Sequence, residues 1–325
     1  DEQIHSLRDA KHTFASLSFI GSATIILCYI RCRDLRKFAF KLVFLISISD
    51  CMSAIGDFIS PPEDRCGPCM FQAYLVSIFN LASVLWTACI GHCLYRAVRH
   101  HDMDVQRFEI RYHIFAWGLP LILALIPSNG MYGYDNGACW ILEKYAYMRF
   151  IQFYIPLIFV IIFNAMIYSQ LIASLRVVLG STENQETRER DMEAFWRMGI
   201  YPVVLVICWF FPIINRLHNF ANPDGPVYEL YMLHRVFASC QGLFNCLVYG
   251  MNRTVREKLP EVFCCRSSSA DDDTDEGGGG IQMAQARAAA SASDRDPESG
   301  SKPADAPEDS DGDRARGSAP ASDAV

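Results

Sequence analysis

Long apolar runs separated by short polar segments occupy most of the chain up to residue 251. The run at 69–98 contains one fully charged side chain, Arg96, near its end. Because a helix rises about 1.5 Å per residue, roughly 20 residues cross the hydrocarbon core of a bilayer, and this run is longer than that. It also contains the polar residues Gln72, Asn80, Ser83, Thr87 and His92. Such groups are tolerated in hydrocarbon only where neighbouring helices or a wet cavity satisfy them, so we predict the central helix of a bundle.

Further apolar runs of similar character surround this one. Together they predict seven spans, at 13–30, 38–60, 69–98, 112–131, 150–179, 195–220 and 227–251. The expected fold class is therefore an all-α membrane protein with a seven-transmembrane helix bundle. An odd number of spans places the two ends of the chain on opposite sides of the membrane.

Lys and Arg are concentrated in one set of connections: after the first run, between the third and fourth, between the fifth and sixth, and after the seventh. The loops of the other set offer only Arg65, Lys144 and Arg149. In membrane proteins the excess of basic residues lies on the cytoplasmic side. We therefore expect a multi-pass protein of the plasma membrane, with its N-terminus outside and its C-terminus in the cytosol.

Composition agrees with a membrane protein, because 51% of the residues are hydrophobic and they are bunched rather than periodic. The net charge of −7 originates in the tail beyond residue 265, where 14 acidic residues outnumber six basic ones, so the remainder of the chain is close to neutral. The tail is otherwise rich in Ser, Gly, Ala and Pro and has almost no apolar residues, which predicts disorder.

The pattern divides the chain into four segments. They are a short extracellular N-terminus at 1–12, the transmembrane domain at 13–252, an amphipathic helix on the membrane surface at 253–265, and a disordered acidic cytosolic tail at 266–325. Cys264 and Cys265 end the amphipathic segment, and juxtamembrane cysteines of this kind are predicted palmitoylation sites. Two free cytosolic thiols are the alternative.

Prolines within the predicted spans indicate bends. Pro120 and Pro127 lie in the fourth span, Pro156 in the fifth, and Pro202 and Pro212 in the sixth. Each removes a backbone donor and kinks its helix, and neighbouring helices can satisfy the freed carbonyl. Kinked helices can act as hinges, although proline is common in membrane helices that have no such role.

Three cysteines lie in or beside loops predicted to be outside, where a disulfide can persist. Cys69 begins the third span and Cys139 lies between the fourth and fifth, so a bond between them would hold that loop over the mouth of the bundle. Cys66 is left without an assigned partner. Cys66 and Cys69 also form a CxxC pair, but no second pair or histidine cluster accompanies it, and we expect no metal site.

Asp50 and Asp57 lie seven residues apart in the second span, hence on one face and two turns from each other. Acidic groups at membrane depth are functional candidates, while a packing role with hydrogen bonds to neighbouring helices is an equal alternative. An intramembrane aspartyl protease would need its two carboxylates on different helices. We therefore expect no enzyme.

Basic residues gather near the predicted outer ends of the last three spans. They are Arg149, Arg216 and Arg235, with Lys144, His218 and His234 nearby. Together they can line a cavity that accepts an anion, since guanidinium pairs well with phosphate or carboxylate. A single terminal arginine that snorkels to lipid headgroups is the alternative for each of them. We predict ligand-binding roles for Arg149, Arg216, Arg235, His234 and Lys144.

Five groups of residues carry a family resemblance. They are Cys69 with Trp86-Thr87 and Leu94-Tyr95; Arg107-Phe108-Glu109 with Trp117-Gly118-Leu119-Pro120-Leu121-Ile122; Cys139-Trp140-Ile141; Arg149-Phe150 with Phe153-Tyr154 and Pro156; and Cys208-Trp209 with Asn215-Arg216. In this order and spacing they resemble the cyclic-AMP receptor family of G-protein-coupled receptors. The resemblance extends over 41–252.

A second resemblance involves the seventh span. Ser239-Cys240-Gln241-Gly242-Leu243-Phe244 with Tyr249 and Asn252, and Trp117-Gly118-x-Pro120 in the fourth, are similar to the secretin and adhesion receptors. Those receptors usually carry a large extracellular domain, whereas the segment before the first span here is short. The chain also lacks Asp-Arg-Tyr after the third span and Asn-Pro-x-x-Tyr in the seventh, which departs from rhodopsin-like receptors.

The resemblance implies a receptor in which an extracellular small ligand, such as cyclic AMP or another anionic metabolite, shifts helix packing and opens a crevice for a heterotrimeric G protein. The implied G-protein-facing residues are Arg96, Arg99, Arg107, Arg111 and Arg197. The candidates for residues that switch between helix arrangements are Asp50, Trp86, Asn215, Gln241 and Tyr249. Membrane lipids, and a receptor kinase and arrestin-like proteins acting on the tail, are further expected partners; we expect no cofactor and no nucleic acid.

Other seven-helix classes fit less well. A retinal protein needs a lysine in the seventh span for its Schiff base, and 227–251 contains none. A secretin- or adhesion-like orphan receptor remains an alternative. A seven-helix transporter is a third possibility, but transporters usually show internal repeats with interrupted helices in matching positions, which we do not find.

Overall fold

The structure is a computed structural model. It describes residues 2–59, 67–99, 104–128, 130–135, 138–179, 185–222, 225–250 and 255–256, all of which belong to one compact unit. The predictions for Cys66, for the palmitoylation sites Cys264 and Cys265, for the acidic tail and for most of the amphipathic segment at 253–265 lie outside the described residues. Val255 is buried against the hydrophobic core.

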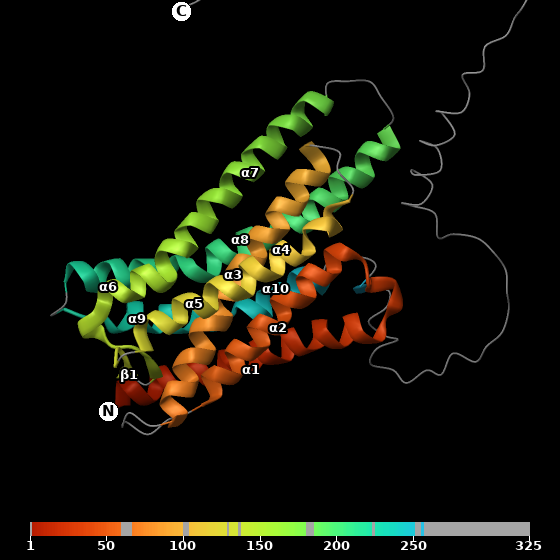
Figure 1. The fold of residues 1–325 in the computed structure, drawn as a ribbon. Coiled ribbons are helices and arrows are strands. Elements are labelled where there is room, and N and C mark those ends of the chain that lie inside the picture. Colours follow the sequence, from red (N-terminus) through yellow and green to blue (C-terminus); the bar gives the residue numbers. More distant parts are fainter. Residues whose placement is uncertain are drawn as a thin grey trace, which may run out of the picture. The chain divides into compact units, whose positions relative to one another are not determined.

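The described part of the chain is mainly helical (Figure 1). The α-helices are α1 (Glu2–Arg31), α2 (Phe38–Phe58), α3 (Gly67–Arg99), α4 (Glu109–His113), α5 (Leu119–Leu125), α6 (Ala146–Arg149), α7 (Ile155–Leu179), α8 (Gln185–Ala221), α9 (Tyr228–Ser239) and α10 (Gln241–Gly250). Short 3-10 segments are η1 (Arg33–Leu35), η2 (Val105–Phe108), η4 (Ile126–Ser128) and η5 (Glu143–Tyr145). Two π-helical segments, η3 (Ile114–Gly118) and η6 (Phe150–Tyr154), complete the fourth and fifth spans.

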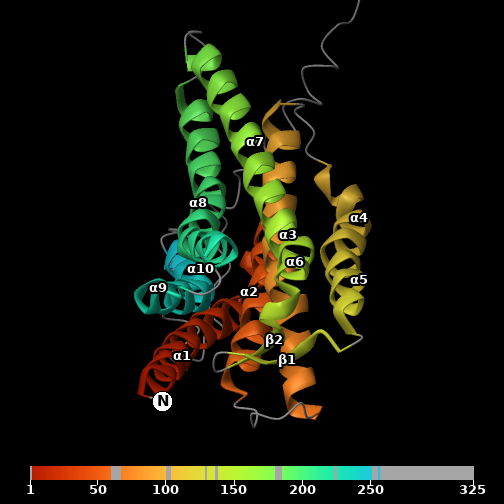
Figure 2. The ribbon, with the colours of Figure 1, turned by 90° about the vertical axis from the view of Figure 1, so that its left-hand side faces the viewer.

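Helix α3 is the central helix, as its sequence predicts. It contacts α2, α5, α7, α8 and the hairpin, and both views show it between the other helices (Figures 1 and 2). Its polar side chains find partners there. Gln72 donates to the carbonyls of Gly56 and Ile59 at 2.9 Å, and Ser53 donates to Asn80 at 2.5 Å.

Six described helical segments are long and apolar enough to cross a membrane. The seventh apolar run forms α9 and α10, which meet at a turn centred on Cys240. Each of these two helices is short by itself, and the backbone N–H of Phe244 bonds to the Cys240 carbonyl at 3.0 Å across the turn. The predicted seventh span is therefore present but interrupted.

Two helices begin earlier than their apolar runs. Helix α1 starts at Glu2 rather than near residue 13, and α8 starts at Gln185 rather than near residue 195. The added turns are polar, so hydropathy does not detect them. In α1 they continue the buried face through Leu7 and Lys11, and the segment expected to be a short N-terminal extension is helical.

Three of the predicted proline bends coincide with irregular helix, and one of them, Pro127, lies within the 3-10 segment η4. Pro120 comes just after η3, and Pro156 just after η6. A proline cannot donate to the carbonyl one turn before it, and a wider π-helical turn accommodates the missing bond. Pro202 and Pro212 lie within α8.

A β-hairpin that the sequence did not predict covers the start of α3. Strands β1 (Tyr132–Asp135) and β2 (Ala138–Ile141) are antiparallel, with Tyr132 opposite Ile141. The predicted disulfide is confirmed, because Cys69 of α3 is bonded to Cys139 of β2. The Cys139 N–H also donates to the Gln72 side chain at 2.9 Å. Strands of four residues are too short to show a periodic signal, which explains why this element was missed.

Tyr132 fixes the hairpin to the helices. Its hydroxyl donates to the Ala124 carbonyl at 2.9 Å and accepts from Gln152 at 2.8 Å. Burial raises the pKa of Tyr132 to about 12, so the phenol stays protonated and keeps its donor role at neutral pH. The hairpin, the N-terminal end of α1 and the start of α3 lie at the same end of the bundle in both views (Figures 1 and 2).

Candidate ligand cavity and polar core

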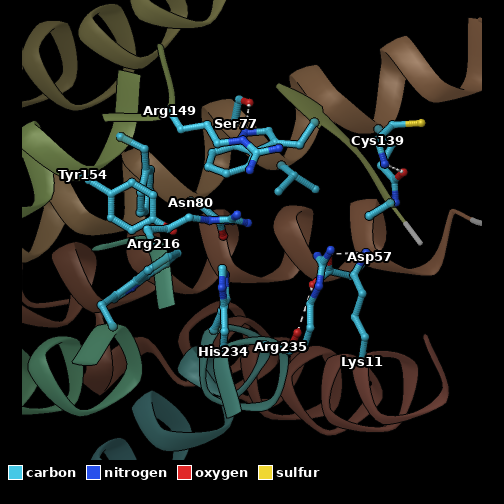
Figure 3. A pocket seen from close by; sticks show the side chains of 18 of the residues that line it. Lys11, Asp57, Ser77, Asn80, Cys139, Arg149, Tyr154, Arg216, His234 and Arg235 are labelled. Atoms are coloured by element: carbon cyan, nitrogen blue, oxygen red, sulfur yellow. Dashed lines mark hydrogen bonds and ion pairs between the residues drawn. The ribbon is translucent and has the colours of Figure 1, made fainter. Parts of the chain in front are cut away.

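A cavity opens at the end of the bundle that carries the hairpin. It contains about 890 Å³ of empty space, part of it continuous with solvent. Its walls come from α1, α2, α3, β2, α6, η6, α8 and α9. Figure 3 shows Arg149, Tyr154 and Arg216 on one side and Lys11, Asp57 and Arg235 on the other.

Two arginines contact the indole ring of Trp140. Arg149, at the end of α6, donates from Nε and Nη2 to the Ile141 carbonyl at 2.8 and 2.6 Å. Its guanidinium carbon lies 5.6 Å from the Trp140 ring centroid, and that of Arg216 in α8 lies at 5.6 Å as well. Arg216 also hydrogen-bonds Tyr154. Both arginines are buried, so their charges are screened little by water.

Helix α9 contributes the next part of the wall. His234 is buried, and its Nδ1 is 2.8 Å from Nδ2 of Asn215 in α8. Tyr231 lies one turn earlier, and Arg216 is 5.8 Å from its ring centroid. Arg235 also lines the cavity. The contact between Asn215 and His234 couples α8 to α9 at the edge of the site.

An ion pair closes the other side of the cavity. Lys11 Nζ lies 3.0 Å from Asp57 Oδ1, and the Ser239 hydroxyl donates to Asp57 Oδ2 at 3.3 Å. Sequence reasoning singled out Asp57 but missed Lys11, because Lys11 precedes the apolar run. A periodic signal existed, since Lys11, Ala15, Ser18 and Ser22 are all buried at helical spacing on one face of α1.

The predicted ligand-binding residues separate into two groups. Arg149, Arg216, Arg235 and His234 line the cavity together. Lys144 does not line it: the residue is exposed, and its Nζ lies 4.9 Å from the Tyr145 ring centroid. His218 is likewise absent from the described lining.

The lining chemistry favours an anion. Four permanently or normally cationic residues line the cavity, namely Lys11, Arg149, Arg216 and Arg235, while Asp57 is the one carboxylate among its described lining residues. Gln152 also faces the cavity, and its Oε1 has no hydrogen-bond partner within the described part of the chain. A guanidinium pair next to aromatic rings and an amide acceptor can bind a phosphate or carboxylate that carries a donor group nearby.

Below the cavity, a polar network contains two of the predicted switch residues. Asp50 accepts from Ser83 at 2.6 Å and from Asn245 at 2.7 Å. Gln241 donates to Ser83 at 2.7 Å and accepts from the Trp209 indole N–H at 2.6 Å. Since Trp209 also lines the cavity, this network connects the cavity wall to the buried carboxylate of α2.

The other switch candidates lie apart from this network. Trp86 is fully buried and packs edge-on against His113 and Trp117, so it contacts the fourth span. Tyr249 packs against Phe40, and its hydroxyl has no hydrogen-bond partner among the described residues. Asn215 belongs to the cavity edge through His234.

Three of the predicted G-protein-facing arginines surround one ring at the opposite end of α3. The guanidinium carbons of Arg96, Arg107 and Arg111 lie 5.3, 5.0 and 5.5 Å from the Phe108 ring centroid. The side chains of the other two, Arg99 and Arg197, lie outside the described residues. These three arginines form a basic cluster at this end of α3, and their role towards a G protein stays a prediction.

The geometry now defines the class of protein. The crystal structure of squid rhodopsin matches with a TM-score of 0.63 at 15% identity, over 90% of this chain and 92% of that one, which shows the seven-helix fold. Such a bundle, with helices long and apolar enough to cross a bilayer, is a multi-pass membrane protein of the seven-helix class.

Comparison with protein families assigns the chain to one family within this class. The profile of the slime mold cyclic AMP receptors matches residues 7–259, and the chain belongs to this family. The resemblance drawn from the motifs is thereby confirmed. The family consists of receptors, so the protein is not an enzyme.

Individual relatives come from plants and amoebae. "G-protein coupled receptor 1" of Arabidopsis thaliana is 36% identical over 256 residues, which are 76% of this chain and 78% of the relative. "Cyclic AMP receptor-like protein A" of Dictyostelium discoideum is 27% identical over 77% of this chain and 66% of its own length. "Cyclic AMP receptor 1" of the same organism is 25% identical, over 72% and 60% respectively. The chain thus spans somewhat less than two thirds of these two Dictyostelium receptors.

Proposed function

We propose that this receptor resides in the plasma membrane with its cavity facing outward, binds an anionic small ligand there, and activates a heterotrimeric G protein in the cytosol. The observation that carries the proposal is the pair of buried guanidinium groups that both lie against the indole ring of Trp140. Buried charges of one sign in a cavity are stabilised by a counter-charge, which an anionic ligand supplies. The names of the amoebal relatives make cyclic AMP a ligand to test first.

The orientation rests on the distribution of basic residues. The loops at the end of the bundle that holds Arg96, Arg107 and Arg111 carry most of the connecting Lys and Arg residues. By the positive-inside rule this end faces the cytosol, and the disulfide-bonded hairpin at the other end faces the oxidising exterior. Ligand binding would change the helix arrangement only as far as it favours one arrangement over another.

Agonist-dependent nucleotide exchange on a purified G protein tests this function. Cyclic nucleotides, nucleotides and other small metabolites are screened against the receptor in lipid nanodiscs. Arg149→Ala and Arg216→Ala are expected to weaken an anionic agonist at least about tenfold, since a charge-assisted hydrogen bond contributes roughly 1.5–3 kcal/mol, and to affect a neutral ligand far less.

Lys144→Ala is the matched control, because Lys144 is an exposed cation near the same end of the bundle but outside the cavity. An equal loss in all three variants would contradict the cavity as the binding site. Substrate flux across the membrane without nucleotide exchange would overturn the receptor function altogether.

A further inference from the structure

A second pocket adjoins the ligand cavity between the fifth and sixth spans. Its described lining residues are Glu143, Ala146, Arg149, Phe150, Arg216, Asn219 and Phe220. Arg149 and Arg216 also line the ligand cavity. Their two side chains are therefore the common wall between the two spaces. The second pocket contains about 600 Å³ of empty space, part of it open to the surroundings.

The far side of this pocket is apolar and faces outward from the bundle. Phe150 and Phe220 pack edge-on with their centroids 5.3 Å apart. Phe220 is 62% exposed, and Leu217, one turn earlier on α8, is 53% exposed. Since α8 is a membrane span, exposed apolar side chains on it face lipid rather than water. The pocket thus connects the cationic wall with the hydrocarbon side of the bundle.

Asn219, which lines this pocket, carries a buried amide donor that a ligand could use. Asn219 is 9% exposed, and its Nδ2 has no hydrogen-bond partner among the residues that the structure describes. Its Oδ1 is in a long contact, 3.5 Å, with His218 Nδ1. Leaving an amide donor unpaired in a buried site is unfavourable. A rotation of the Asn219 side chain that brings Nδ2 to the pocket would let it donate to an acceptor oxygen there.

The charge of the pocket limits what that oxygen can belong to. Glu143 lines the pocket and places a carboxylate at it, which would repel a second anionic group. A neutral acceptor such as an ester or amide carbonyl is compatible with both Asn219 and Glu143. The anionic group itself belongs at Arg149 and Arg216, on the common wall.

We infer that the receptor's ligand is an anionic amphiphile that occupies both spaces. Its phosphate or carboxylate binds between Arg149 and Arg216, its carbonyl oxygen accepts from Asn219, and its alkyl chain lies along Phe150 and Phe220 toward the lipid. This inference rests on the proposed function, because it takes the cationic cavity as the ligand site, and it adds the class of ligand.

A matched pair of probes separates the two contributions. Glycerol 3-phosphate carries the anionic head alone, and 1-octanoyl-lysophosphatidic acid adds an ester carbonyl and a short chain to the same head. Binding of each is measured on the full receptor in phosphatidylcholine nanodiscs, with empty nanodiscs subtracted to correct for partitioning. The acyl ester is expected to bind at least about tenfold more tightly, since each buried methylene contributes roughly fourfold in affinity.

Two variants test whether the alkyl chain of the ligand occupies the second pocket. Phe220→Trp fills the second pocket and Asn219→Leu removes its donor; both are expected to lower the affinity for the acyl ester about tenfold and to leave glycerol 3-phosphate unchanged. Phe210→Trp is the control, because Phe210 is 52% exposed on the same helix but is not part of either described lining.

The outcomes are distinct. If both probes bind equally, or if Phe210→Trp and Phe220→Trp have the same effect, the amphiphile inference is wrong while an anion site remains. If compact anions such as cyclic AMP activate the receptor and the acyl ester does not bind, the inference is again wrong and the proposed function stands. If no anion binds and Arg149→Ala changes nothing, both fail together.

Discussion

Lys11 and Asp57 form an ion pair, 3.0 Å long, that joins the first two helices of the bundle inside the ligand cavity. Their side chains are only 7% and 14% exposed, so water and salt screen the pair weakly. Ser239 of α9 donates to the same carboxylate. One acidic side chain therefore connects three helices at the wall where an anionic ligand would bind.

This relationship predicts that Asp57→Asn has two opposite effects. Lys11 loses its counter-charge in a nearly buried position, which we expect to destabilise the fold by about 3 kcal/mol, seen as a lower Tm. The cavity becomes more positive at the same time. At an effective dielectric constant of 20, two unit charges about 10 Å apart interact by roughly 1.7 kcal/mol, so an anionic ligand should bind about tenfold more tightly.

Asp9→Asn provides the control for Asp57→Asn, because it removes one negative charge from an exposed position on the same end of α1. Isothermal titration with an anionic agonist and a thermal melt measure the two effects. Unchanged anion affinity in Asp57→Asn would show that Asp57 does not compete with the ligand for the cavity's cations.

The disulfide should be essential for a functional cavity. Cys69 and Cys139 close a loop with a sequence separation of 70, and a loop of that length corresponds to about 4 kcal/mol of stabilisation in the chain-entropy account. Cys139→Ala is expected to reduce surface expression and ligand response, because the hairpin that carries Trp140 is no longer tied to α3. Cys51→Ala, at a half-buried free thiol, should be close to wild type. Normal surface expression and signalling by Cys139→Ala would show that the cavity does not need the disulfide.

A close contact between α1 and α10 predicts a stability effect at one glycine. A Cβ atom on Gly242 would lie 2.9 Å from the backbone oxygen of Ser18, and backbone cannot move aside as a flexible side chain can. The Gly242 N–H also donates to the Ser18 hydroxyl at 3.0 Å. Gly242→Ala should therefore destabilise the receptor by about 1–3 kcal/mol.

The control for Gly242→Ala is Gly250→Ala in the same helix, where an added Cβ meets no atom from the described part of the chain outside that helix within 4 Å. Thermal unfolding of both variants in detergent measures the difference. Equal melting temperatures would mean that α1 and α10 can move apart at no cost in stability. Their contact would then be looser than the distances indicate.

The arginines around Phe108 should affect signalling without affecting ligand binding. Arg107 and Arg111 are exposed, and the nearby Glu109 is paired with Lys41, which leaves a basic surface. The double variant Arg107→Gln with Arg111→Gln is expected to slow receptor-catalysed nucleotide exchange several-fold at unchanged agonist affinity. Arg33→Gln, an exposed arginine in the connection between α1 and α2, is the control. If agonist affinity fell as well, the slower exchange would result from a disturbed fold rather than from a lost contact with the G protein.

Much of the architecture could be predicted because apolar residues in a membrane protein are bunched. The seven runs follow from such bunching, the central position of α3 follows from the polar residues within its run, and the pairing of Cys69 with Cys139 follows from the positions of a few cysteines. The hairpin was missed, since four-residue strands are too short to show a period. The first turns of α1 were missed because they are polar, although they carry Lys11 into the cavity.

The candidate site was predicted in part for the same reason. Arg149, Arg216, Arg235 and His234 were found because a cation near the end of an apolar run stands out. Lys144 met the same criterion and yet lies outside the cavity, since it precedes α6 and its side chain turns to the neighbouring Tyr145. Distance along the chain does not determine the direction in which a side chain points.

Asp50 and Asp57 show what the sequence determines by itself and what depends on the tertiary structure. Their spacing by itself determined that both lie on one face of one membrane helix. Only the tertiary structure decided that Asp50 meets Ser83 and Asn245 while Asp57 meets Lys11, because the helices beside α2 tilt and begin at points that no local pattern encodes. Hydropathy determines where a helix is buried, whereas the partner of each buried charge depends on how neighbouring helices are placed around it.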